Sequence, residues 1–136
     1  PSPDDVLSYK IHGVDTKFVQ TMRSYIKGDL SADDLTGMRI HGVTPEFIKE
    51  LEAIGFTNLS ADDLTGFRIH GVTPGFIKSI QALGFKPSAD DLTGLKIHGV
   101  TPEFIETVKS RGFTDVTLEQ LIELRRMNII PGARKK

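Results

Sequence analysis

The chain has 136 residues, with 17 Lys and Arg against 18 Asp and Glu, a formal net charge of −1 and no Cys. The near balance of charge argues against a dedicated polyanion-binding protein, because phosphate neutralisation dominates affinity for nucleic acid. The lack of Cys excludes a disulfide scaffold, a thiol nucleophile and a Cys-ligated metal site. The sequence shows no apolar run near the roughly 18 residues of a membrane span and no N-terminal signal pattern, so we expect no membrane association, and the compartment stays open.

An internal repeat organises the whole chain. The tripeptide His-Gly-Val recurs at a nearly constant spacing, beginning at His12, His41, His70 and His98. A period of this length is typical of stacked helical units. We therefore predict an all-α fold of tandem helical hairpins, stacked as a short α-solenoid and forming one domain over residues 1–136. The repeats span 1–30, 31–59, 60–87 and 88–116, and a half-length copy over 117–136 supplies a capping helix and a disordered basic tail.

The first helix of each repeat has clear start and stop signals. Ser31 is a good N-cap, and Asp34 three residues later completes the pattern of a capping box. Gly42 falls where a left-handed residue ends the helix. The other copies repeat these signals at Ser60, Asp63 and Gly71 and at Ser88, Asp91 and Gly99, with Asn128 in the last copy.

The second helix of each repeat begins at a Thr-Pro pair, such as Thr44-Pro45, which is typical of an N-cap followed by the first helical residue. It continues with apolar residues at helical spacing and ends at Gly55-Phe56. A hairpin of this size cannot bury both helices alone, so the units are expected to stack.

Two features of the first helices are expected to serve this stacking. Ile40 lies off the apolar stripe of its helix, so we expect it to face a neighbouring repeat. Glycine inside a helix costs about 1 kcal/mol. Its recurrence at Gly37, Gly66 and Gly94 therefore predicts close approaches between helices.

Neither the histidines nor the paired aspartates predict a chemical centre. Equivalent residues of stacked repeats lie roughly 8–10 Å apart. Ligands of one zinc lie within about 2.1 Å of the metal, so the histidines of adjacent copies cannot share one. The pairs exemplified by Asp33-Asp34 fall in the first turn of a helix, where the helix dipole stabilises negative charge. We predict no catalytic residue, no metal site and no cofactor.

One stretch of each repeat suggests an alternative function. Residues 64–84 resemble the helix-hairpin-helix family, whose hairpin reads Gly-apolar-Gly and donates backbone N–H groups to phosphate. The resemblance implies nucleic-acid binding through the turns. Because Thr73 stands where the second hairpin glycine belongs, nucleic acid ranks behind a protein partner. The candidate phosphate-binding residues are Arg39, His41, Arg68, His70, Lys96 and His98.

A second resemblance covers nearly the whole chain. Residues 30–56, with the core His41-Gly-Val-Thr-Pro, resemble a repeat of uncharacterised bacterial proteins. In some of these the repeat follows the membrane-embedded metallopeptidase domain of beta-lactam-sensor-type antirepressors. The resemblance implies an accessory docking module, and no peptidase residue is carried over because the chain has no His-Glu-x-x-His motif.

The function predicted from the sequence is that of a non-catalytic helical repeat protein, a protein–protein interaction or structural docking module. We expect the chain to be a monomer whose partner is another protein. Extended faces of repeat arrays are the usual binding surfaces. The candidate partner-binding residues are the variable positions of the second helices, Glu46, Glu50, Ser79, Gln81, Glu103, Thr107 and Lys109.

Overall fold

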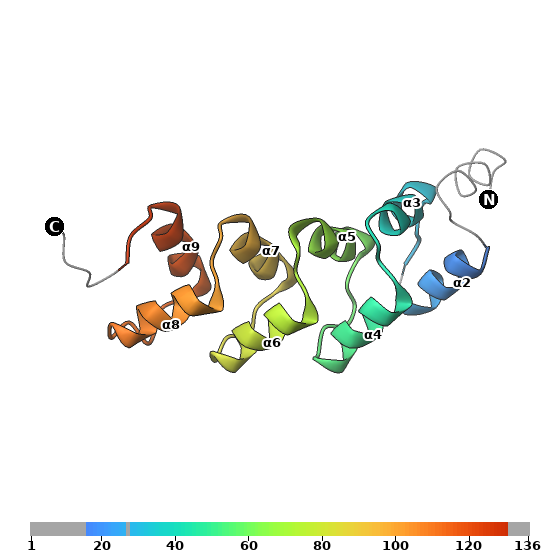
Figure 1. The fold of residues 1–136 in the computed structure, drawn as a ribbon. Helices are drawn as coiled ribbons and strands as arrows, with labels where there is room; N and C mark the ends of the chain where they lie inside the picture. Colours follow the sequence, from blue (N-terminus) through green and yellow to red (C-terminus); the bar gives the residue numbers. More distant parts are fainter. Residues whose placement is uncertain (1–15, 27, 131–136) are drawn as a thin grey trace. The chain divides into compact units, whose positions relative to one another are not determined.

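The computed structural model describes residues 16–26 and 28–130, and every regular element in these ranges is an α-helix (Figure 1). The chain divides into two compact units, Pro1–Ile69 and His70–Lys136. The helices are, in order, α2 (Thr16–Tyr25), α3 (Ala32–Ile40), α4 (Pro45–Ala53), α5 (Ala61–His70), α6 (Pro74–Ala82), α7 (Ala89–Ile97), α8 (Pro102–Ser110) and α9 (Leu118–Arg126). None of these helices is long and apolar enough to cross a membrane. The predicted all-α fold is confirmed, whereas one continuous domain over residues 1–136 stays a prediction.

Each first helix in the described ranges begins with the predicted capping box. Ser31 Oγ accepts a hydrogen bond from the Asp34 N–H at 3.0 Å, and the Ser31 N–H donates to Asp34 Oδ2 at 3.0 Å. These bonds satisfy N–H groups that the start of a helix otherwise leaves unpaired. The same reciprocal pairs form between Ser60 and Asp63, Ser88 and Asp91, and Thr117 and Gln120.

The turn inside each hairpin is closed by a left-handed residue, as predicted. Gly42 has a φ of 77°, and the following Val43 N–H donates to the Met38 carbonyl at 2.8 Å. This bond satisfies a carbonyl that the end of a helix leaves without a partner. The other copies have the same conformation, with φ of 75° at Gly71, 71° at Gly99 and 55° at Asn128.

The second helix of each repeat buries one apolar face. Thr44 caps α4 by accepting from the Phe47 N–H at 3.1 Å, and Pro45 occupies the first turn. The inward face of α4 buries Phe47, Ile48 and Leu51. Full burial of one such side chain contributes roughly 1.5–3 kcal/mol. Equivalent buried residues are Ile77 and Ile80 in α6 and Phe104, Ile105 and Val108 in α8.

Equivalent helices of consecutive repeats pack against each other within each unit. In the first unit α2 packs on α4, and in the second α6 packs on α8 and α7 on α9. The rings of Phe56 and Phe67 meet edge to face across a repeat boundary, with their centroids 6.5 Å apart. The helical repeats therefore stack within each unit, and α9 covers α7 as the predicted terminal helix.

Two stacking predictions for the first helices have different outcomes. The prediction for Ile40 was wrong, because its side chain is 57% exposed and does not face a neighbouring repeat. The predicted close approach is confirmed at Gly94, whose Cβ would stand 3.4 Å from Ile122 Cδ1 of an adjacent helix. It was wrong at Gly37, where a Cβ would meet no described atom within 4 Å, and at Gly66 it stays a prediction, because the next first helix belongs to the other unit. The predicted first helix of the first repeat and the basic tail fall in residues 1–15 and 131–136, outside the described residues.

Candidate functional site

A cation in the last turn of each first helix lies over an aromatic ring of the preceding repeat. Arg68 Cζ lies 4.2 Å from the centroid of the Phe47 ring. The electron-rich face of such a ring attracts a cation, and each contact therefore joins two consecutive repeats. The other pairs are Arg39 over Phe18 at 5.3 Å, Lys96 over Phe76 at 4.4 Å and Arg125 over Phe104 at 5.4 Å.

Among the cations whose preceding turn lies in the described residues, Arg68 and Arg125 also bond to that turn. Arg68 Nε donates to the Gly42 carbonyl at 2.9 Å, and Arg125 Nε donates to the Gly99 carbonyl at 3.1 Å. Hydrogen bonds from a charged donor are stronger than neutral ones. Three candidate phosphate ligands thus lie in contacts between repeats, namely Arg39, Arg68 and Lys96. Phosphate binding by them stays a prediction, and it would compete with these contacts.

The remaining phosphate candidates are the histidines at the ends of the first helices. His41 and His98 are the C-cap residues of α3 and α7, and His70 is the last residue of α5. All three are exposed. Over residues 16–26 and 28–130, no group of three or more His, Asp or Glu side chains is placed to hold a metal ion.

The candidate partner-binding residues of the second helices divide into two groups. Glu46, Glu50, Ser79 and Glu103 are exposed, whereas Gln81, Thr107 and Lys109 are half-buried.

Several of these side chains already bond within the chain. The hydroxyls of Ser79 and Thr107 donate to carbonyls of their own helices, those of Gly75 and Glu103. Lys109 Nζ donates to the Leu83 carbonyl at 2.6 Å. Lys109 therefore connects α8 to the preceding repeat, and the exposed glutamates are the members of this set with the most accessible side chains.

Sequence reasoning missed an apolar surface at the turns of the hairpins. Ile40, Ile69 and Ile97 are 57%, 53% and 56% exposed, at the same position of three successive first helices. Each precedes an exposed histidine. We use the name turn edge for the exposed residues of these Ile-His pairs in each unit taken by itself, Ile40, His41 and Ile69 in the first unit and His70, Ile97 and His98 in the second. The available signal was the position of Ile40 off its apolar stripe, which the sequence analysis assigned to packing between repeats.

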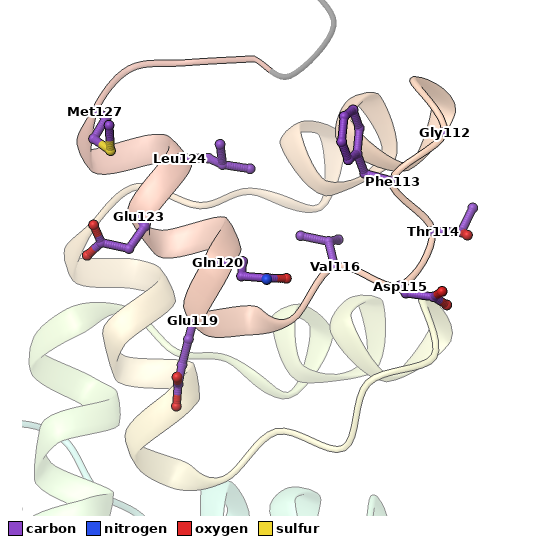
Figure 2. A pocket seen from close by; sticks show the side chains of 10 residues that line it. All are labelled: Gly112, Phe113, Thr114, Asp115, Val116, Glu119, Gln120, Glu123, Leu124 and Met127. Carbon is purple, nitrogen blue, oxygen red and sulfur yellow. The ribbon is translucent and has the colours of Figure 1, made fainter.

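A second apolar surface lies in the last repeat, between the end of α8 and α9. This terminal groove has a volume of about 840 Å³. Figure 2 shows Leu124 of α9 directed toward the ring of Phe113, with Val116 between the two segments. The exposed fraction of Phe113 is 46%. The residues that line the groove are Gly112, Phe113, Thr114, Asp115, Val116, Glu119, Gln120, Glu123, Leu124 and Met127.

Comparison with protein-family models, with curated proteins and with solved structures gives no match. The two resemblances drawn from the sequence therefore stay predictions. What the chain does has to be inferred from its own surfaces, and both the turn edge and the terminal groove expose large apolar side chains.

Proposed function

We propose that the chain is a non-catalytic docking module that binds another protein through the turn edge. The observation that carries the proposal is the exposure of more than half of the side chain at Ile40, Ile69 and Ile97. Exposed large apolar groups that recur at one place of a structural unit are typical of interaction surfaces rather than of chance exposure.

The pattern of variation between the copies supports this proposal. The first copy differs from the others at several positions, such as Asp15 and Lys17, yet it keeps the Ile-His pair at Ile11 and His12. In the terminal copy Arg126 and Met127 stand at these positions. The sequence of the first copy thus keeps an isoleucine at this position although other positions differ, and another residue type replaces it in the half-length copy.

The surroundings of the isoleucines favour a particular kind of partner. Arg39 and Arg68 precede Ile40 and Ile69, and the stacking of each cation on a ring limits its freedom before any partner binds. A side chain ordered in advance loses less entropy on binding. A partner segment with apolar side chains flanked by carboxylates would complement the isoleucines and the adjacent cations.

A comparison of two surface variants tests the proposal. We would immobilise the wild-type chain, an Ile40→Ser/Ile69→Ser/Ile97→Ser variant and a Glu46→Lys/Glu103→Lys variant, and identify bound proteins from a lysate of the organism that makes the chain by mass spectrometry. The expected result is a protein captured by the wild type and by the glutamate variant, with at least about tenfold less captured by the isoleucine variant.

Two other patterns of capture would contradict binding through the turn edge. Loss of capture only in the Glu46→Lys/Glu103→Lys variant would place the interface on the second helices. Equal capture by all three chains would show that neither surface is used. Because the substituted side chains are exposed, all three proteins are expected to have the same helical circular dichroism spectrum.

A further inference from the structure

The terminal groove has a counterpart one repeat earlier, and there a helix covers it. In the second unit α8 packs on α6. Lys109 Nζ donates to the Leu83 carbonyl at 2.6 Å and lies 4.8 Å from the centroid of the Phe85 ring. The second helix of one repeat therefore covers the end of the second helix before it, and its contact is a cation placed over a phenylalanine.

In the last repeat no helix of the described residues covers the same surface. Arg111 and Phe113 stand one repeat after Leu83 and Phe85, and Arg111 is the C-cap of α8 as Leu83 is of α6. Phe113 is 46% exposed and forms one wall of the groove in Figure 2. The groove thus corresponds in the repeat alignment to the surface that α8 covers one repeat earlier.

Helix α2, the first described helix of the chain, resembles α8 in its position in the repeat and in one exposed cation. Helix α2 is the second helix of its repeat, and it packs on α4, which follows it. The repeat alignment places Arg23 of α2 at the position that Lys109 has in α8, and Arg23 is exposed. Helix α2 therefore carries a cation at the position that, in α8, binds the carbonyl and the phenylalanine of the preceding repeat.

The charges of the two surfaces are also complementary. Helix α2 contains Lys17 and Arg23 and no acidic residue. The lining of the groove contains Asp115, Glu119 and Glu123 and no basic residue, and of these carboxylates Glu123 is paired with Arg126 of the same helix at 3.3 Å. Opposite charge on two surfaces favours their encounter and disfavours the pairing of either surface with itself.

We propose that the terminal groove binds helix α2 of a second copy of this chain, so that copies associate head to tail. Arg23 of the second copy lies over the Phe113 ring and donates to the Arg111 carbonyl, as Lys109 does with Phe85 and Leu83. Two different surfaces meet, so a pair of copies leaves one surface of each kind open and the assembly can continue. The expectation of a monomer from the sequence is the alternative that the experiment below decides.

Two single substitutions each disrupt one of the two proposed contact surfaces, helix α2 or the terminal groove. Arg23→Glu removes the cation of α2 and places a carboxylate against an acidic groove. Phe113→Asp removes the ring from the groove and leaves α2 intact. Both side chains are exposed, so the melting temperature is expected to stay close to that of the wild type. Lys49→Glu, which reverses an exposed cation on α4, is the matched control.

Sedimentation velocity over a range of concentrations supplies the decisive measurement. The wild type and Lys49→Glu are expected to show larger average mass as concentration rises, whereas Arg23→Glu and Phe113→Asp alone stay monomeric, with association weakened at least about tenfold. A mixture of Arg23→Glu and Phe113→Asp combines one intact groove with one intact helix, and it is expected to form a 1:1 dimer that grows no further.

Three results would overturn the proposal. Wild-type protein that stays monomeric over the whole range would leave the groove to a partner of another sequence. Association of either single variant at the wild-type strength would show that the contact lies elsewhere. A mixture of the two variants that stays monomeric, while the wild type associates, would exclude a head-to-tail contact.

Discussion

Arg68 Nε donates a hydrogen bond to the carbonyl oxygen of Gly42, 2.9 Å away and 26 residues earlier in the chain. Gly42 is the left-handed residue that ends the first helix of one repeat, and Arg68 lies in the last turn of the first helix of the next. The carbonyl of a residue in such a turn points away from its own helix and lacks a partner there. The turn of one repeat is therefore completed by a side chain of the following repeat.

Replacement of Arg68 by alanine is expected to destabilise the first unit. The substitution removes the bond to Gly42 and the stacking on Phe47. A stacked cation at an exposed site contributes about 0.5–1 kcal/mol. A hydrogen bond from a charged group adds a contribution of similar size when it is solvent-exposed. We expect Arg68→Ala to lower the free energy of unfolding by about 1–2 kcal/mol, as measured by urea denaturation followed by circular dichroism.

Two further variants separate the hydrogen bond from loss of charge alone. Lys96 lies over the Phe76 ring at 4.4 Å and, within the described residues, makes no hydrogen bond to the turn of the preceding repeat, so Lys96→Ala is expected to cost less than Arg68→Ala. Lys49→Ala removes an exposed cation of α4 and is expected to change the stability by less than about 0.5 kcal/mol. Equal effects of all three substitutions would show that the contact with Gly42 contributes nothing.

Gly37 is expected to be a site where a larger residue stabilises the protein. A Cβ at this position meets no described atom within 4 Å, and glycine in a helix is less favourable than alanine by about 0.5–1 kcal/mol. We expect Gly37→Ala to raise the free energy of unfolding by that amount. Gly42→Ala is the opposite control, because its φ of 77° places a side chain in the left-handed region at a cost of roughly 1–2 kcal/mol. A lower free energy of unfolding in Gly37→Ala would instead support the close approach between helices that the sequence predicted at this position.

The local part of the fold could be predicted because its signals act over a few residues. The capping box of Ser31 and Asp34 and the left-handed Gly42 involve groups that are close together in the chain, and the sequence places these groups directly. Because the same signals recur in each copy, the prediction for one hairpin applies to the others as well.

The surfaces could not be predicted, because exposure depends on residues distant in the sequence. The position of Ile40 off its apolar stripe indicated a neighbour, and no pattern in the sequence shows whether one is within reach. Arg68 was assigned to phosphate for the same reason, since its partners Phe47 and Gly42 lie in the preceding repeat. Phe113 stands at the same repeat position as Phe85. Lys109 of the next second helix lies over the Phe85 ring, whereas the side chain of Phe113 is 46% exposed.

The contacts of the cations with aromatic rings lead to a prediction about binding to nucleic acid. Three of the six candidate phosphate ligands, Arg39, Arg68 and Lys96, lie over rings, and the exposed face of the second helices carries Glu46 and Glu103. We expect no saturable binding to labelled random-sequence single- or double-stranded DNA by fluorescence anisotropy at about 50 mM salt. Saturable binding that weakens steeply by about 200 mM salt would favour the helix-hairpin-helix alternative over the docking module.

The contacts between repeats also predict that a whole repeat can be removed. Deletion of residues 60–87 takes out one complete repeat, so Lys96 acquires the same separation from Phe47 along the chain that Arg68 now has. Ser88 then follows Leu59 and still forms its capping box with Asp91, because both partners lie inside the retained repeat. We expect a shorter helical protein with a cooperative thermal transition by circular dichroism and a lower melting temperature, since one set of contacts between repeats is lost.

Deletion of residues 60–73 removes a first helix alone and places two second helices in succession, so this control is expected to unfold without a cooperative transition. Loss of helix in the 60–87 deletion would mean that the copies are not interchangeable, and that the cation-over-ring contacts do not set the stacking.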